Sequence, residues 1–367
     1  MPPVWDAVAG DYETQDGWIK LHTNLPHHRK AALCVLEVGA IRGKVKEAVQ
    51  SWHRDELETE IVKMGGVAAA MRSRDEWRAH PQGQAVACEP LITWSDARRS
   101  QIRSWPASRA RPLNGLRVLD LTRVLAGPVA TRTLAGFGAD VLRIDPPGWD
   151  EPNVVPDITL GKRCSFLELN QPADRKTFED LLSKADVLIH GYRPDALAGL
   201  GYNEEARLDI SPSLIEISLD AYGWTGPWSK RRGFDSLVQM SCGIADAGMH
   251  WANRDQPTLL PVQALDHATG YLMAAAAVRA VSLAANGNGL KNARLSLART
   301  AELLIANPQS IEGALGKQPA PEDFLNSTEQ TPWGQAHRLK PAVNIEGVPM
   351  EWRRPACELG TSIPQWL

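Results

Sequence analysis

Short hydrophobic runs that recur between residues 116 and 219 constrain the fold of this 367-residue chain more than any other feature. Segments with loop or helical character separate the runs, which are rich in Val, Ile and Leu. They read LRVLDL, ADVLRI, RCSFLEL, ADVLIH and LIEISL. Near-continuous apolar strands that alternate with helices are typical of a parallel sheet buried on both faces. The sequence therefore predicts an α/β fold with a doubly wound, mostly parallel, Rossmann-like sheet.

The segments between the runs support this topology. Residues 170–186 read as a crossover helix, with Asn170 as its cap, Pro172 in its first turn and Phe178 on its apolar face. The first run leads through TRVLAGP into a helix with Pro128 near its start. A strand that ends at a helix N-terminus marks the edge where such sheets bind ligands.

Residues 1–105 predict a second, smaller α/β domain. DGWIKLHTN reads as a strand, HRKAALCVLEV and KVKEAVQSWHRDELETEIVKMGG read as helical, and SRDEWRAH opens a further helix. The linker SWPASRARP follows, so we assign residues 106–367 to the large domain. From about residue 306 the chain is rich in Pro, Gly and polar residues without periodicity, which predicts an irregular tail.

Composition excludes some classes of function. With 40 basic and 43 acidic residues the net charge is −3, and no long run of Lys and Arg occurs, so we expect no nucleic-acid partner. The first strand is followed by neither a G-x-G-x-x-G nor a G-x-x-x-x-G-K-[ST] motif, which removes the main support for a dehydrogenase or an NTPase. His27 and His28 are adjacent without further ligands at suitable spacing, so we assign no metal.

The spacing of the cysteines and the most apolar segment indicate the cellular compartment of the protein. The cysteines are far apart in sequence and never in a C-x-x-C spacing, which favours reduced thiols in a reducing compartment. They are Cys34, Cys88, Cys164, Cys242 and Cys357. The stretch LMAAAAVRAVSLAA is short for a membrane span and carries Arg279. We therefore expect a cytoplasmic protein with no membrane partner.

One carboxylate, Asp266, stands near the start of a long apolar helix in residues 260–280, LPVQALDHATGYLMAAAAVRA. Pro261 forbids a helix before it, so Asp266 falls where free backbone N–H groups need an acceptor. The helix dipole would equally favour an ionised nucleophile there, and Gly270 leaves room for a ligand. Spacing alone leaves the capping role and the catalytic role open.

Longer motifs run in order through residues 111–305. They include RPLNGLRVLDLTRVLAGPVATRTLAGFGADVLRIDPPG, GKRCSFLELN, ADVLIHGYRPDALAGLG, AYGWTGPW, and GFD ahead of ALDHATG. These motifs resemble the class III CoA-transferases, the family of formyl-CoA transferase and carnitine CoA-transferase. The opening domain resembles the family's small domain, and RRPACELGTS resembles its closing R-P-A-P-x-L-G-E-H-T. In relatives the small domain is inserted after the first part of the large domain, whereas here its counterpart comes first.

The resemblance implies a CoA-transferase that moves CoA from an acyl-CoA to a free carboxylic acid. In this family the aspartate at the position of Asp266 is the nucleophile, which implies a mixed anhydride followed by an aspartyl–CoA thioester. It implies no metal and no cofactor beyond the CoA thioester substrate. It also implies a homodimer, although the interlinked ring that relatives form does not follow from the altered domain order.

The resemblance further implies which residues contact CoA. Those expected to line the adenine and ribose are Leu125, Ala126 and Leu167. Those expected to contact the nucleotide or the pantetheine arm are Gly191, Tyr192, Arg193 and Tyr222. Pro146 and Asp220 stand where formyl-CoA transferase has an arginine and a lysine, so two phosphate contacts are absent. The cations considered as replacements are Arg143, Lys162 and Arg163.

Two alternatives remain open. The acyl-CoA racemase branch of the family carries a histidine in a G-H-D triplet, but here that position is Phe234, which cannot exchange a proton. His267 is a conceivable replacement base, although a solvent-facing histidine at a helix start is the simpler interpretation. The second alternative is a non-catalytic CoA-binding subunit that needs a partner chain to complete its site.

Overall fold

The computed structural model describes residues 5–192, 196–308 and 318–367, and these form two compact units. Unit 1 comprises the described residues within 1–91, 220–265 and 296–310, and unit 2 those within 92–219, 266–295 and 311–367. Each unit therefore combines segments that are far apart in sequence. Residues 220–265, which the sequence analysis places in the large domain, belong to the same unit as the N-terminal segment.

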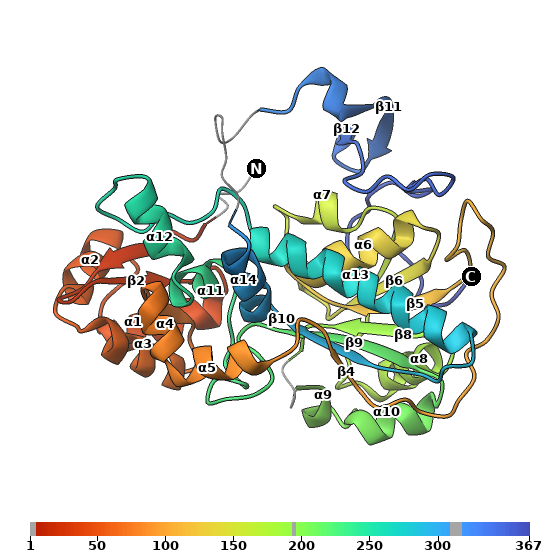
Figure 1. The fold of residues 1–367 in the computed structure, drawn as a ribbon, viewed down its shortest axis with the longest axis horizontal. Coiled ribbons are helices and arrows are strands. Elements are labelled where there is room, and N and C mark those ends of the chain that lie inside the picture. Colours follow the sequence, from red (N-terminus) through yellow and green to blue (C-terminus); the bar gives the residue numbers. More distant parts are fainter. Residues whose placement is uncertain (1–4, 193–195, 309–317) are drawn as a thin grey trace. The chain divides into compact units, whose positions relative to one another are not determined.

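Unit 2 is built on a seven-stranded sheet with the order β4-β10-β9-β8-β5-β6-β7 (Figure 1). The strands are β4 (Thr93–Trp94), β5 (Arg117–Leu121), β6 (Asp140–Asp145), β7 (Arg163–Phe166), β8 (Val187–His190), β9 (Ile215–Asp220) and β10 (Ala293–Ser296). The strands from β9 to β7 pair in parallel, whereas β10 and β4 pair antiparallel. The five parallel strands coincide with the five hydrophobic runs, so the mostly parallel sheet is confirmed.

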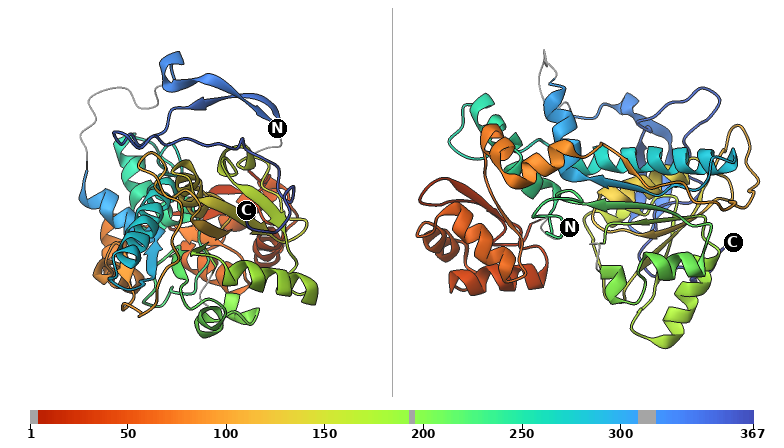
Figure 2. Two further views of the ribbon diagram at one scale, coloured as in Figure 1. Left: turned by 90° about the vertical axis from the view of Figure 1, so that its right-hand side faces the viewer. Right: turned by 60° about the horizontal axis from the view of Figure 1, so that its bottom comes forward.

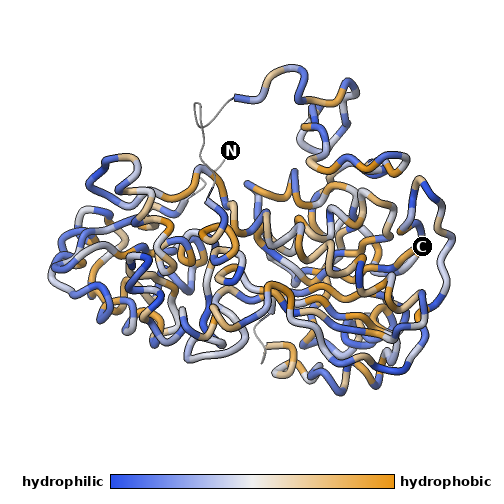
Figure 3. The backbone as a smooth tube through the Cα atoms, viewed as in Figure 1, coloured by the Kyte–Doolittle hydropathy of each residue, from blue (hydrophilic) through white to orange (hydrophobic). Residues whose placement is uncertain are grey.

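Helices cover both faces of this sheet. They are α6 (Ala126–Gly136), α7 (Val155–Ile158), α8 (Pro172–Ser183), α9 (Ala196–Gly199), α10 (Glu204–Ile210) and α13 (Ala264–Ala285). Leu119, Leu142 and Leu188 lie in register and pack against α8 in one core cluster. Figure 2 shows α6 and α13 on the opposite face, and Figure 3 shows the hydrophobic strands between these layers. The predicted doubly wound arrangement is thus present.

Unit 1 holds a three-stranded antiparallel sheet with the order β1-β2-β3. Its strands are β1 (Gly10–Glu13), β2 (Trp18–Leu21) and β3 (Ala68–Ala70). Its helices are α1 (Pro26–Leu36), α2 (Arg42–Val49), α3 (Arg54–Lys63), α4 (Arg74–Ala79), α5 (Pro81–Cys88), α11 (Asp235–Ser241), α12 (Ile244–Trp251) and α14 (Leu297–Ala306). One face of the sheet packs on α1, α2 and α3, and the other on α11. The smaller α/β part expected from the sequence is therefore present.

Two local expectations differ from the structure. The single helical stretch predicted around residues 44–66 is divided into α2 and α3 by a turn, in which the backbone N–H of Trp52 donates to Val49 O. The tail predicted to be irregular contains a 3₁₀ turn (Pro321–Asp323) and an antiparallel hairpin of β11 (Phe324–Thr331) and β12 (Gly334–Leu339). The hairpin escaped detection because its strands are mostly polar on both faces, which removes the alternation that identifies strands.

Helix α13 is long and apolar enough to cross a membrane, judged by its length and composition. Half of its most apolar stretch is buried inside the molecule, and the core helices of soluble proteins pass the same test. The helix is longer than the apolar stretch considered in the sequence, because it begins at Ala264 and continues to Ala285. Its composition is therefore weak support for membrane insertion.

Candidate active site

Asp266 is the third residue of α13 and lies in its first turn. The helix begins two residues earlier, at Ala264, and the capping role and the catalytic role of Asp266 both stay predictions. Only 6% of Asp266 is exposed. A carboxylate in the first turn benefits from the positive end of the helix dipole, and this benefit is greater where water is excluded. The sequence predicts a carboxylate near the positive end of this helix dipole, and the structure adds that the residue is buried.

Helix α13 approaches the N-terminal turn of α6 at Gly270. A Cβ atom at Gly270 would lie 2.5 Å from the backbone oxygen of Ala126 and 2.8 Å from Cβ of Val129. Only glycine allows the two helices to come this close. Since residues four apart share one face of a helix, Asp266 lies one turn before this contact on the same face. The predicted nucleophile and the predicted nucleotide-binding residue Ala126 thus belong to neighbouring helix N-termini.

His267 lies beside Asp266 and is half-buried. The sequence analysis interprets it as a histidine that faces solvent, and the structure differs from this. Burial lowers its pKa, and the positive charge of Arg132 lowers it further, whereas Asp157 acts in the opposite direction. Arg132 and Asp157 form an ion pair. At neutral pH the imidazole is therefore uncharged and does not neutralise the neighbouring carboxylate.

Arg123 follows the end of β5 and is surrounded by aromatic rings. Its guanidinium lies 4.3 Å from the centre of the Trp149 ring and 5.6 Å from that of Tyr192. One of its nitrogens donates to the Tyr192 hydroxyl at 3.2 Å, and another lies 3.7 Å from Asp145. About a quarter of this side chain, 26%, remains exposed. The arrangement places a partly accessible cation at the ligand-binding edge of the sheet.

The loop between β5 and α6 is strained where it meets a carboxylate. Val124 has a φ of 64°, which is unfavourable for a β-branched residue. Its backbone N–H donates to Glu151 at 2.7 Å, and Arg143 donates to the other oxygen of Glu151, also at 2.7 Å. Glu151 therefore occupies a position in which an N–H group and a guanidinium together bind a negative charge.

The cations considered as replacement phosphate ligands are buried and already paired. Arg143 donates to Asp145 at 2.7 Å, and Lys162 donates to Asp120 at 2.9 Å. The side chains of Arg143 and Lys162 are fully buried. Burial opposes ionisation of Asp120, but the charges of Lys162 and Arg143 together with hydrogen bonds from Thr122 and Thr131 lower its pKa.

Arg163 is paired as well, since it donates to both carboxylate oxygens of Asp140 at 3.0 Å. Its side chain is 10% exposed. Arg143, Lys162 and Arg163 are thus each paired with a carboxylate, so the hypothesis that one of them contacts the CoA phosphates stays a prediction in which the phosphate competes with this partner.

The predicted CoA-contacting residues of unit 2 are distributed over two clusters. Leu125 packs with Val129 and with Tyr271 of α13, whereas Leu167 belongs to the core on the α8 side of the sheet. Gly191 is exposed, and among the described residues no atom lies within 4 Å of a hypothetical Cβ there; it precedes Tyr192 just after β8. Arg193 lies outside the described residues. Their roles stay predictions.

Tyr222 belongs to unit 1 and is described with it. Its side chain is 1% exposed, and its hydroxyl lies 3.3 Å from Oγ of Ser241. The loop that carries it is fixed to α5, because Gln82 donates to the backbone oxygen of Tyr222 at 2.8 Å and Glu89 accepts from the N–H groups of Trp224 and Thr225. Within unit 1, Tyr222 is therefore a buried residue of a well-anchored loop.

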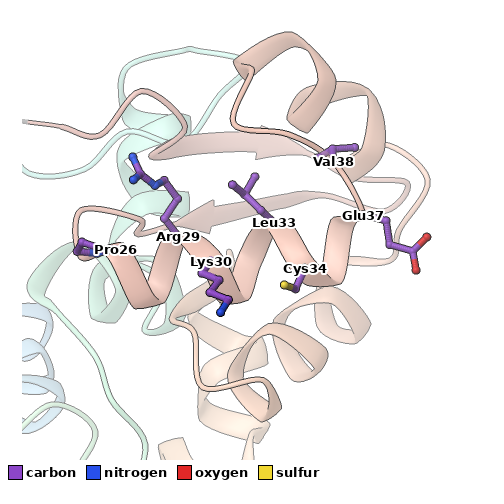
Figure 4. Close-up of a pocket in the computed structure, with 7 residues that line it drawn as sticks. All are labelled: Pro26, Arg29, Lys30, Leu33, Cys34, Glu37 and Val38. Atoms are coloured by element: carbon purple, nitrogen blue, oxygen red, sulfur yellow. The ribbon is translucent and has the colours of Figure 1, made fainter.

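Two surface hollows are described, one in each unit. The hollow in Figure 4 runs along α1, has a volume of about 410 Å³ and is lined by Pro26, Arg29, Lys30, Leu33, Cys34, Glu37 and Val38. The other, of about 480 Å³, lies in unit 2 beside Arg111, Arg353 and Arg354. Neither is lined by a residue predicted to bind CoA.

Sequence reasoning missed Arg123, Trp149 and Glu151. Arg123 stands in the quoted TRVLAGP segment directly after the first strand, so its position was a usable signal. Trp149 and Glu151 follow the second parallel strand in the segment PPGWDE. Because the ends of adjacent parallel strands meet at one edge, these segments were candidates for contact.

Comparison with known proteins identifies the family of this chain. The model of the family described as CoA-transferase family III matches residues 113–343. An acetyl-coenzyme A transferase of Hypoxylon pulicicidum is 35% identical over 233 residues, which cover 59% of this chain and 39% of the relative. The succinyl-CoA:glutarate CoA-transferase of Homo sapiens is 30% identical over 243 residues, which cover 62% of this chain and 52% of the relative. The chain thus spans about half the length of these relatives, or less.

A solved structure shares the fold. The crystal structure of a hypothetical protein of Mycobacterium tuberculosis superposes with a TM-score of 0.50 and 28% sequence identity, covering 54% of this chain and 57% of that one. Because the family model spans more than half of the 367 residues, the chain belongs to CoA-transferase family III.

Proposed function

We propose that this chain transfers CoA from an acyl-CoA to a free carboxylic acid, with Asp266 as the nucleophile. The observation that carries the proposal is the position of Asp266: it is 6% exposed, lies in the first turn of α13 and stands one turn before the contact of Gly270 with α6. Family membership and the names of the relatives support the reaction class.

The proposed reaction proceeds by alternating attacks on carbonyl carbons. A carboxylate oxygen of Asp266 attacks the thioester carbonyl, the C–S bond breaks, and a mixed anhydride and CoA thiolate result. The thiolate then attacks the Asp266 carbonyl carbon and releases the donor acid as a carboxylate. The acceptor carboxylate attacks the aspartyl–CoA thioester, and the same steps in reverse yield the new acyl-CoA and free Asp266.

The surroundings of Asp266 suit this cycle. The N-terminal end of α13 favours the carboxylate that starts each half-reaction. Asp266 itself is almost completely buried, and the exclusion of water around it would protect the anhydride and the thioester from hydrolysis. Arg123, a partly exposed cation beside Tyr192, is our candidate for a nucleotide contact.

The test is to trap the intermediate. The protein is incubated with a panel of acyl-CoAs, treated with hydroxylamine and digested for peptide mass mapping. We expect a hydroxamate on the peptide that holds Asp266. Asp266→Asn should lose the adduct and lower the rate of CoA exchange by about 10³-fold or more. Asp246→Asn is the matched control, because Asp246 is also the third residue of its helix.

Each outcome separates the alternatives. An adduct that persists in Asp266→Asn would refute Asp266 as the nucleophile. If no donor gives an adduct although the protein binds CoA, the non-catalytic subunit becomes the better interpretation. Exchange of the α-proton of an acyl-CoA with solvent, without CoA transfer, would favour the racemase branch.

We also propose that the protein acts as a cytoplasmic homodimer. Sedimentation equilibrium of the purified chain tests the dimer, since a monomer at all concentrations would contradict it.

A further inference from the structure

The hollow of unit 2, of about 480 Å³, lies at the amino ends of its parallel strands. Of the residues that line it, Gly115 precedes β5, Gly138 precedes β6 and Gly161 precedes β7. Residues predicted to contact CoA, such as Leu125 and Tyr192, instead follow the carboxyl ends of β5 and β8. Because the strands are parallel, these two sets lie at opposite edges of the sheet. The hollow is therefore separate from the candidate active site.

The lining of this hollow carries an excess of positive charge. Three arginines contribute to it, namely Arg111, Arg353 and Arg354. The acidic residue of the lining is Asp140, and both of its oxygens already accept hydrogen bonds from Arg163 at 3.0 Å. Within the described part of the chain, the side chains of Arg353 and Arg354 form neither a hydrogen bond nor an ion pair. The charges of these two arginines are therefore not neutralised by the protein.

Arg111 is held in place by uncharged groups. Its Nη1 donates to the backbone oxygen of Glu351 at 2.7 Å and to that of Gly136 at 3.2 Å. Its Nε is buried and has no hydrogen-bond partner among the described residues. This atom lies 3.2 Å from the position that a Cβ of Gly138 would take, so the guanidinium lies against the glycine that lines the hollow. An arginine with a spare buried donor and no carboxylate partner is suited to an anionic ligand.

The charges around Arg111 repel one another. Burial lowers the pKa of Arg111, and the positive charge of Arg353 lowers it further, whereas Glu351 has a smaller effect in the opposite direction. Arg353 is thus close enough to Arg111 for their like charges to interact. An anion bound beside both guanidinium groups would replace this repulsion by attraction.

The segment that carries Arg353 and Arg354 is fixed to the sheet. The backbone N–H of Gly161 donates to the backbone oxygen of Arg354 at 3.1 Å. Further along the segment, the backbone N–H of Ser362 donates to the oxygen of Cys164 in β7 at 2.8 Å, and the backbone N–H of Cys164 donates to the Ser362 hydroxyl at 3.3 Å. Because the backbone is already ordered, little of its conformational freedom would be lost when a ligand binds.

We propose that this hollow binds the phosphate group of a small molecule, with Arg353 and Arg354 as its main ligands and Arg111 as a third cation. The planar guanidinium group matches the oxygens of a phosphate through paired hydrogen bonds. A phosphate monoester carries nearly two negative charges at neutral pH, which suits three arginines better than the single charge of a carboxylate. The volume of the hollow falls within the range of small-molecule sites, about 300–1,000 Å³. Free phosphate and an organic phosphate share this chemistry.

The experiment measures binding to the full chain by isothermal titration calorimetry, in phosphate-free buffer at constant ionic strength. The probes are inorganic phosphate and glycerol 3-phosphate. We expect saturable binding, and the double variant Arg353→Gln/Arg354→Gln should weaken it by about 10-fold or more, because charge-assisted hydrogen bonds are lost. Since neither side chain has a partner in the protein, this variant should fold normally. Arg279→Gln is the matched control, because Arg279 is an exposed arginine of α13 that does not line the hollow, and it should leave the affinity unchanged.

A second measurement locates the bound phosphate. Phenylglyoxal modifies accessible arginines, and peptide mapping should show that the tighter-binding probe protects Arg353 and Arg354 but not Arg279. Tighter binding of glycerol 3-phosphate would identify an organic phosphate as the ligand, and tighter binding of inorganic phosphate the free ion; both results support the site.

The proposal would be overturned if neither probe binds saturably, if the double variant retains the affinity, or if Arg279→Gln weakens binding equally. Neither measurement requires CoA-transferase activity, so the outcome is independent of the proposed function.

Discussion

Lowering the pH from 7 to 5 should destabilise unit 1 through one buried imidazole, that of His22. Its ring stacks on Phe234 with a centroid distance of 4.0 Å and an angle of 4°, and the edge of the Trp5 ring lies 5.7 Å away. Its Nδ1 atom has no hydrogen-bond partner among the described residues. Burial, and then the charge of Lys20, lower the pKa of His22 from 6.5 to about 4.

The direction and the size of the change in the free energy of unfolding follow from proton linkage. The folded protein excludes a proton that the unfolded chain binds below pH 6.5, so the stabilisation is complete above 6.5 and decreases as the pH falls toward 4. At pH 5 the unfolded His22 is protonated while the folded one is still neutral. Over roughly 1.5 pH units at about 1.4 kcal/mol each, the free energy of unfolding drops by about 2 kcal/mol.

The assay is urea denaturation at pH 7 and pH 5, compared between the wild-type protein and His22→Phe. We expect the phenylalanine variant to lose about 2 kcal/mol less than the wild-type protein on acidification, whatever its stability at pH 7. Burial also lowers the pKa values of His28 and His80, so the wild-type loss exceeds the contribution of His22. His250→Phe, at a side chain that is 71% exposed, is the control. Equal losses in the wild-type protein and His22→Phe would refute the reasoning.

Two further predictions concern unit 2. Gly270→Ala should destabilise the protein by about 1–3 kcal/mol, because the new Cβ would lie 2.5 Å from the backbone oxygen of Ala126. The measurement is the midpoint of thermal unfolding. The control is Val278→Ala, at an exposed position of the same helix, which should change this midpoint little. Asp120→Asn should cost about 3–5 kcal/mol, because it leaves the charge of Lys162 buried without its partner. Combining it with Lys162→Met should restore much of the stability in chemical denaturation, and a double variant as unstable as the single one would contradict this explanation.

The parallel strands could be predicted from the sequence because burial on both faces gives each one a continuous apolar run. The start of α13 could be predicted only to within a few residues, since Pro261 excludes a helix before it but does not fix its first turn. The hairpin of β11 and β12 could not be predicted, because its mostly polar strands carry no alternation.

The residues of the candidate site could be predicted where they belong to a sequence motif. The ion pairs between side chains that are distant in sequence could not be predicted. Asp266 and Ala126 belong to recognisable segments, and Gly270 explains why their helices approach each other. Asp145 lies two residues after Arg143 on the same face of β6, so this pair was within reach of the sequence. The partner of Lys162, Asp120, lies on the distant strand β5 and could not be identified from the spacing. A cation that the sequence suggests is available for a ligand is often already neutralised inside the protein.

The position of Ser362 against Cys164 has a consequence for solubility. β7 is the last strand of its sheet, and the open edge of such a strand offers free N–H and C=O groups to any other chain. Ser362 satisfies both backbone groups of Cys164, and the Ser165 hydroxyl donates to the backbone oxygen of Ser362 at 2.6 Å. The C-terminal segment thus acts as a cover for this edge, and a chain that lost it would expose a template for edge-to-edge aggregation before it lost its fold.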